Sequence, residues 1–95
     1  MNARRGVRPF FPPMILLLDE LADGAHATVR SVRADSPDLD ATMLRRLAEL
    51  GFIAGEPVEL LRRGPGGREP LAVRVGESLF ALRRAEARCI EVEAH

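Results

Sequence analysis

Apolar and polar residues alternate with a period of two along much of the chain. Five segments show this alternation: residues 26–31, 57–63, 71–75, 79–82 and 88–94. Glycines interrupt the pattern at residues 64–67 and at Gly76. Side chains of a strand point alternately to opposite faces, so the pattern predicts about five short β-strands joined by tight turns.

A helical period interrupts the strand pattern between residues 37 and 50. Apolar residues recur there at spacings of four, four and three, at Leu39, Met43, Leu47 and Leu50. Ser36 suits the N-cap of a helix, Pro37 suits its first position, and Gly51 suits the residue just past its end. We therefore expect one inserted α-helix at about 37–50, and a short helical turn near 83–87.

The fold class follows from these elements. Short strands, glycine turns and one helix predict a mainly β domain, a small and partly open β-barrel. The chain of 95 residues can bury a single core at most, and we expect residues 14–95 to form it. Residues 1–13 carry three arginines and three prolines without a period, which predicts a disordered N-terminal extension.

Charge and composition argue against several classes of function. Fourteen basic residues balance fourteen acidic ones, so no long-range attraction to nucleic acid is expected. Trp and Tyr are absent, which removes the usual aromatic platforms for single strands and proline-rich peptides. The apolar run at residues 14–18 is too short for direct membrane insertion. A lone cysteine fits a cytoplasmic protein, and no catalytic motif is present, so we predict a binding module and not an enzyme.

The end of the chain carries candidate metal ligands. If the last strand continues to the end, side chains with suitable donor atoms share one face at Cys89, Glu91, Glu93 and His95. Such atoms suit Fe²⁺ or Zn²⁺, but neighbours on that face are about 7 Å apart, so a second strand or chain would have to complete the site. The simpler interpretation of these residues is a solvent-exposed acidic strand edge that binds no metal. His26 is likewise first a surface histidine and second a candidate ligand, and no cofactor is required.

Phe52 and Ile53 lie between Gly51 and Gly55, directly after the predicted helix. Burial in the core is the default for Phe and Ile. Contact with a partner is the alternative, and both interpretations stay open at this point. The partner-binding hypothesis adds Leu50 and a polar rim of Arg45, Arg46 and Glu49.

The order of these pieces resembles the FeoA family of bacterial ferrous iron uptake proteins. Residues 45–92, RRLAELGFIAGEPVELLRRGPGGREPLAVRVGESLFALRRAEARCIEV, follow the family pattern. That pattern has a helix ending in Leu-x-x-Leu-Gly, a second glycine, a strand, a Pro/Gly loop, a strand starting with Pro-Leu, and a closing aLRxxEAxxI.V. The segment LDELADGAHATVRSV matches the family opening, so the resemblance covers about residues 14–93.

The resemblance implies an SH3-like barrel that is accessory to FeoB, a membrane transporter with a cytosolic G-protein domain. The same domain ends iron-dependent repressors, but the 13 residues before it are too few for a helix-turn-helix. We therefore expect a cytoplasmic regulatory module that contacts FeoB or its G domain at the inner face of the membrane. The alternative is a metal-binding or metal-sensing module that forms a homodimer through the C-terminal strand face. A GTPase activator would need an arginine that reaches the nucleotide, and the sequence nominates none.

Overall fold

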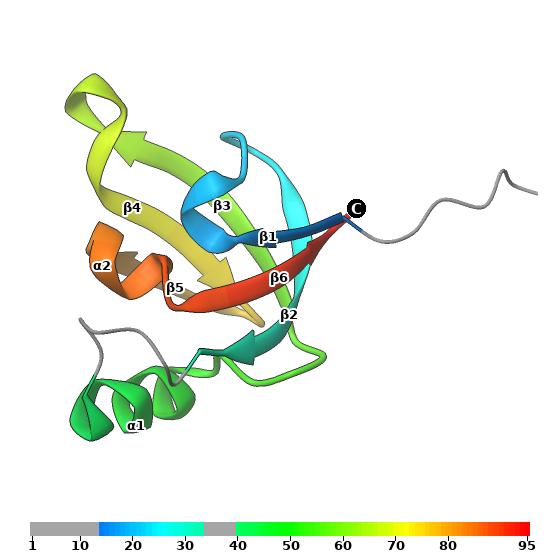
Figure 1. Cartoon of the computed structure of the whole chain (residues 1–95). Helices are drawn as coiled ribbons and strands as arrows, with labels where there is room; N and C mark the ends of the chain where they lie inside the picture. The colour runs from blue at the N-terminus through cyan, green and yellow to red at the C-terminus, as the bar shows by residue number, and fades with distance from the viewer. Residues whose placement is uncertain (1–13, 34–39) are drawn as a thin grey trace, which may run out of the picture.

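A strongly curved antiparallel sheet of six strands forms the body of the protein, in the order β1-β6-β2-β3-β4-β5 (Figure 1). The strands are β1 Met14–Leu17, β2 His26–Val32, β3 Pro57–Gly64, β4 Arg68–Val75, β5 Ser78–Leu82 and β6 Ile90–Ala94. The computed structural model describes residues 14–33 and 40–95. The predicted extension at residues 1–13 lies outside the described residues.

The mainly β fold class is confirmed, with one strand more than expected. The additional strand is β1, which pairs antiparallel with β6 at the edge of the sheet. Its residues, MILL, are all apolar, so the strand has no alternation by which it could be predicted. β4 also begins earlier than the predicted segment at residue 71, directly after the 3-10 turn η2 at Pro65–Gly67.

The main helix, α1, spans Ala41–Leu50 and begins later than predicted. Asp40 has extended backbone angles, and its carboxylate accepts a hydrogen bond from the Met43 N–H at 2.8 Å. Asp40 is therefore the N-cap of α1. The predicted cap at Ser36 and the predicted first turn from Pro37 lie outside the described residues. The second helix, α2, spans Arg84–Ala87 and confirms the helical turn predicted there.

Gly51 ends α1 in the left-handed conformation, with φ 112°. Its N–H bonds to the Ala48 carbonyl at 3.1 Å, and the next N–H, from Phe52, bonds to Leu47 at 3.1 Å. A Cβ at Gly51 would meet Val75 only at ordinary van der Waals distance. The cost of a side chain here therefore comes from the backbone angle.

We expect Gly51→Ala to lower the free energy of unfolding by about 1 kcal/mol, the usual penalty of a non-glycine residue in the left-handed region. Gly51→Asn should lose less, because asparagine tolerates this region better than alanine. Urea unfolding of both variants measures the difference. Equal stability of Gly51→Ala and the unmodified chain would show that the cap is unimportant.

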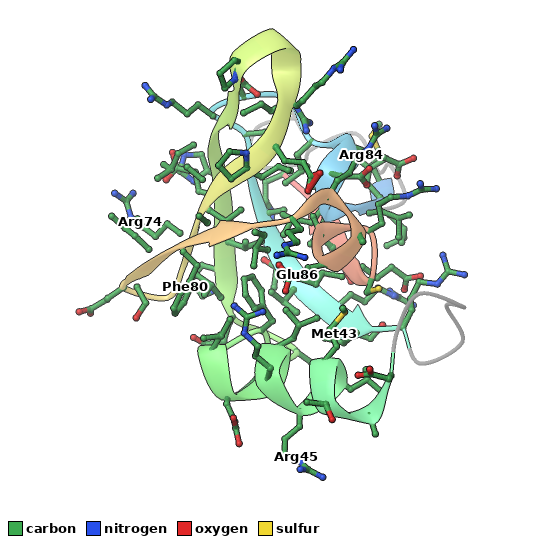
Figure 2. All side chains as sticks on the ribbon, turned by 90° about the vertical axis from the view of Figure 1, so that its left-hand side faces the viewer. Met43, Arg45, Arg74, Phe80, Arg84 and Glu86 are labelled. Atoms are coloured by element: carbon green, nitrogen blue, oxygen red, sulfur yellow. The ribbon has the colours of Figure 1, made fainter. Side chains whose placement is uncertain are left out.

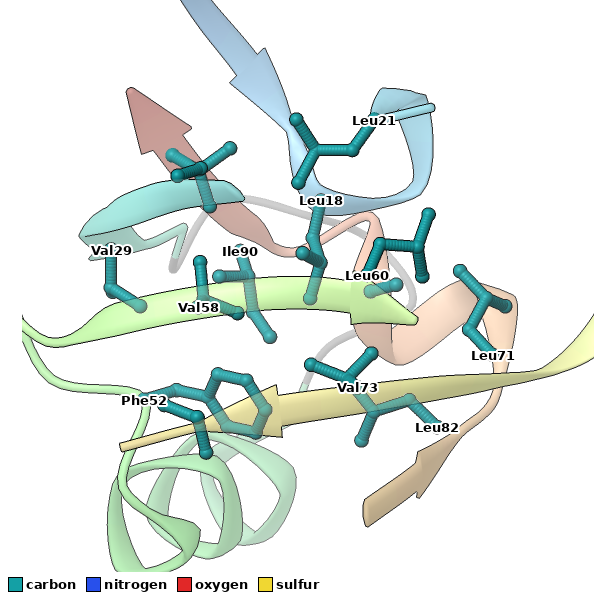
Figure 3. Packing of buried hydrophobic residues seen from close by; sticks show 14 of the residues in the cluster. Leu18, Leu21, Val29, Phe52, Val58, Leu60, Leu71, Val73, Leu82 and Ile90 are labelled. Carbon is teal, nitrogen blue, oxygen red and sulfur yellow. The ribbon is translucent and has the colours of Figure 1, made fainter. Parts of the chain in front are cut away.

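One hydrophobic core lies inside the curved sheet (Figure 3). Strands from both halves of the chain, the 3-10 turn η1 at Leu18–Glu20 and helix α1 all contribute side chains to it. Fully buried members include Leu18, Val29, Leu47, Phe52, Leu60, Leu71, Val73, Leu82, Ile90 and Val92. Leu47 anchors α1 in this core, a few residues before the segment that follows the helix.

Candidate functional site

The elbow, residues 51–55, separates its two large apolar residues. Phe52 is 2% exposed, and its ring lies 6.3 Å from the Phe80 ring, measured between centroids. Ile53 is 55% exposed. The prediction of Phe52 as a partner contact is therefore wrong, because its side chain points into the core between α1 and the sheet (Figure 3). Ile53 alone of this pair lies at the surface.

Backbone hydrogen bonds hold the elbow on the sheet. The Gly55 N–H donates to the Val29 carbonyl at 2.8 Å, and the Val29 N–H donates to the Glu56 carbonyl at 2.8 Å. Within the elbow, the Ile53 N–H donates to the Gly51 carbonyl at 2.8 Å. Each bond limits the freedom of this short segment. The exposed Ile53 side chain is thus presented from a backbone that is fixed to both α1 and β2.

The predicted polar rim of the elbow divides into outward and inward residues. Arg45 and Glu49 are exposed on α1, and Leu50 is half-buried against the core. Figure 2 shows Arg45 on the side of α1 that faces away from the sheet. We call Arg45, Glu49, Leu50 and Ile53 the helix–elbow surface.

Arg46 points toward α2 and makes an internal ion pair. Its guanidinium donates to Glu86 Oε2 at 2.5 Å. Glu86 is only 5% exposed, and its other oxygen accepts the Arg83 N–H at 2.8 Å. Sequence reasoning missed Glu86, since its partner is far away in the sequence. The placement of Arg46 in the rim was therefore incomplete: a large part of its role is to neutralise a buried carboxylate.

The candidate metal ligands at the end of the chain do not form one set. Cys89 lies in the turn before β6, is buried, and donates its S–H to the Ala85 carbonyl at 3.2 Å. The prediction that it shares a face with the later residues is wrong, because the strand starts only at Ile90. Glu91 and Glu93 do share a face, where Arg30 contacts both carboxylates at 3.3 Å.

The two histidines, which the sequence treats separately, lie next to each other. The backbone N–H of His95 donates to the backbone carbonyl of His26 at 3.2 Å. Both residues line a hollow of about 350 Å³, together with Glu59 and Arg74. Within residues 14–33 and 40–95, no group of three or more His, Cys, Asp or Glu residues could hold a metal ion as the side chains stand.

The hollow also contains residues that sequence reasoning missed. Glu59 lies opposite His26 in the β2–β3 register, and Arg74 lies opposite Glu59 in the β3–β4 register. Arg74 donates to Glu59 Oε1 at 2.9 Å, and His26 Nε2 lies 3.7 Å from Glu59 Oε2. The alternation of these strands predicted outward side chains. The pairing register, which brings His26, Glu59 and Arg74 together, could not be derived from the alternation.

Comparison with known proteins assigns the family. Residues 16–94 match the model of the FeoA domain. The chain belongs to the FeoA family. The FeoA protein of Stenotrophomonas maltophilia, solved in complex with zinc and described as a prokaryotic SH3 domain protein, is 42% identical, with a TM-score of 0.72 over 82% of this chain and 89% of that chain. FeoA of Chlorobium tepidum is 34% identical, with a TM-score of 0.71 over 83% of this chain and 70% of that one.

More distant likeness extends to repressors. A manganese-dependent transcriptional repressor is 22% identical, with a TM-score of 0.72 over 92% of this chain and 45% of that chain. At this identity the likeness shows the fold alone. No curated protein sequence matches this FeoA chain.

Membership of the FeoA family connects the chain to ferrous iron transport. It also confirms the SH3-like fold that the resemblance implied. No helix within the described residues is long and apolar enough to cross a membrane.

Proposed function

We propose that this chain is an accessory, regulatory module of ferrous iron uptake that binds a FeoB-type transporter or its G-protein domain at the cytoplasmic face of the membrane. Family membership supports the iron-transport role. Our proposed binding site is the helix–elbow surface. The observation that carries this choice is Ile53, a large apolar side chain that is 55% exposed on a backbone fixed by hydrogen bonds.

The helix–elbow surface has the composition of a small protein–protein contact. It combines two apolar residues, Ile53 and the half-buried Leu50, with two exposed charges of opposite sign on α1, Arg45 and Glu49. Interfaces commonly place apolar anchors at the centre and polar groups around them. A fixed backbone lowers the entropy that is lost when such an anchor binds. An arginine that activates a GTPase has to reach the nucleotide. On this surface that arginine would be Arg45, because the neighbouring Arg46 is paired with Glu86.

A pair of matched variants tests the proposal. Ile53→Asp should weaken binding to the purified G-protein domain of the transporter about tenfold or more, as expected for loss of an interface anchor. Leu79→Asp is the control, because Leu79 is a similarly exposed apolar residue (61%) on the edge strand β5. Calorimetry measures the affinity, and ferrous iron uptake in cells gives the functional readout.

Each outcome of this experiment bears on the proposal. Selective weakening by Ile53→Asp supports the helix–elbow surface. Equal weakening by Leu79→Asp would place the contact elsewhere. Absence of any binding between the unmodified chain and either the G domain or the full transporter would overturn the proposed function itself.

The alternative function is a metal-binding or metal-sensing module that forms a homodimer through the C-terminal strand face, and one of its predicted ligands does not lie on that face. A metal module joined through Cys89, Glu91, Glu93 and His95 requires a shared ligand face, and the buried Cys89 is not on it. Dimerisation through this face remains a prediction. Light scattering with and without metal measures it.

A further inference from the structure

His26 and His95 lie opposite each other: His26 begins β2, and His95 directly follows β6. The β2–β6 register pairs Ala27 with Ala94, which places His26 opposite the residue that follows β6. The backbone hydrogen bond from His95 to His26, at 3.2 Å, confirms this position. Cβ atoms of opposed residues are about 4.5–5.5 Å apart. Two imidazoles on such positions can therefore reach a common ion.

Each of the two imidazole rings has a side-chain oxygen near its Nε2 atom. Thr28 Oγ1 lies 2.6 Å from His95 Nε2, and Glu59 Oε2 lies 3.7 Å from His26 Nε2. Within the described part of the chain, neither Nδ1 atom has a hydrogen bond or ion pair. A histidine that binds a metal through one nitrogen usually donates the other N–H to a carboxylate or another oxygen. The Thr28 hydroxyl already lies at hydrogen-bond distance from the His95 ring, and the Glu59 carboxylate lies at ion-pair distance from the His26 ring.

We propose that His26 Nδ1 and His95 Nδ1 together bind one divalent first-row transition-metal ion, such as Zn²⁺. Imidazole suits these ions, with metal–nitrogen distances of about 2.0–2.1 Å. Glu59 and Thr28 act as outer partners that orient the two rings. Glu59 does not act as a third ligand, because Arg74 holds its other oxygen at 2.9 Å.

The rest of the coordination sphere is water. No third ligand of the His, Cys, Asp or Glu type is close enough within residues 14–33 and 40–95, and the hollow of about 350 Å³ has room for water beside the rings. Two protein ligands and an open side make an exchangeable site, in contrast to the closed four-ligand sites that stabilise folds. The bound ion would connect β2 to the residue that follows β6. This metal site does not depend on the proposed contact with the transporter.

Titration of the full chain with Zn²⁺ alone, followed by calorimetry, tests the proposal. We expect one ion per chain. His26→Ala and His95→Ala should each weaken binding at least about tenfold, while Glu59→Gln and Thr28→Val should each weaken it by about tenfold, as is typical when outer partners of a metal ligand are lost. Thermal unfolding without zinc verifies that each variant is folded.

Three control variants separate this site from other donors. Cys89→Ala and the double variant Glu91→Gln with Glu93→Gln should bind zinc as the unmodified chain does, since these residues lie outside the proposed site. Ile53→Asp should also bind normally, which separates failure of this inference from failure of the transporter contact. The inference is overturned if the unmodified chain does not bind zinc, if both histidine variants keep full affinity, or if one ion binds per two chains.

Discussion

Phe52→Ala is expected to lower the free energy of unfolding by about 3–5 kcal/mol, the usual cost of removing a buried aromatic ring. Phe52 is 2% exposed and packs against Phe80. Its loss would leave a cavity between α1 and the sheet, where Leu47 is also buried. Small domains have a total stability of about 5–15 kcal/mol, so the variant should melt far below the unmodified chain.

Ile53→Ala is the matched control for this prediction. Ile53 is the adjacent apolar residue but is 55% exposed, so its replacement should change the stability by about 0.5 kcal/mol or less. Urea unfolding measures both variants. If the two lose equal stability, Phe52 is not the core residue of the elbow. A combined replacement of Phe52 and Ile53 would abolish binding by unfolding the chain, so only Ile53 is suitable for binding tests.

Arg46→Ala is expected to lower the free energy of unfolding by about 1–2 kcal/mol. Breaking a fully buried ion pair costs about 3–5 kcal/mol, because the remaining charge has no partner. Here the Arg46 side chain is 55% exposed and that of Glu86 is 7% exposed, so water would reach the carboxylate once Arg46 is removed, and the cost is reduced accordingly. The remaining hydrogen bond from Arg83 N–H also limits the loss.

Arg45→Ala provides the comparison, since Arg45 is the preceding residue on α1 and is exposed. Its replacement should be nearly neutral, within about 0.5 kcal/mol. Thermal unfolding of the two variants, together with Glu86→Gln and the double variant Arg46→Ala with Glu86→Gln, forms a double-mutant cycle. Equal melting of Arg45→Ala and Arg46→Ala, or a cycle without coupling, would show that the ion pair does not stabilise the fold.

Local patterns were sufficient to predict most elements of this fold. The alternation at residues 57–63, 71–75 and 79–82 matches β3, β4 and β5, and Gly51 caps α1 as its position after Leu50 indicated. These features depend on neighbours in the sequence. The start of α1 was predicted too early because Asp40 caps a helix as well as Ser36 does, and a sequence pattern does not rank the two.

The candidate sites could not be predicted in the same way, because they are formed by residues that are far apart in the sequence. Phe52 and Ile53 have similar hydrophobicity, and only the direction of the elbow decides which one is buried. Arg46 and Glu86 are 40 positions apart, and Thr28 and His95 are 67 apart. Such pairs are set by where the fold places α1 relative to α2, and by the register of β2 with β6. No local pattern contains that information.

The position of β6 in the sheet also determines when the protein can fold. β1 and β2 follow each other in the sequence but do not pair, because β6 lies between them and bonds to both. During synthesis, β1 therefore emerges from the ribosome long before its partner exists. The sheet can close only after residues 90–94 have been made, and such long-range pairing makes folding slow compared with that of helical proteins of this size. Until then the apolar β1 segment has an unpaired edge on both sides, which is the state in which a nascent chain most needs protection from aggregation.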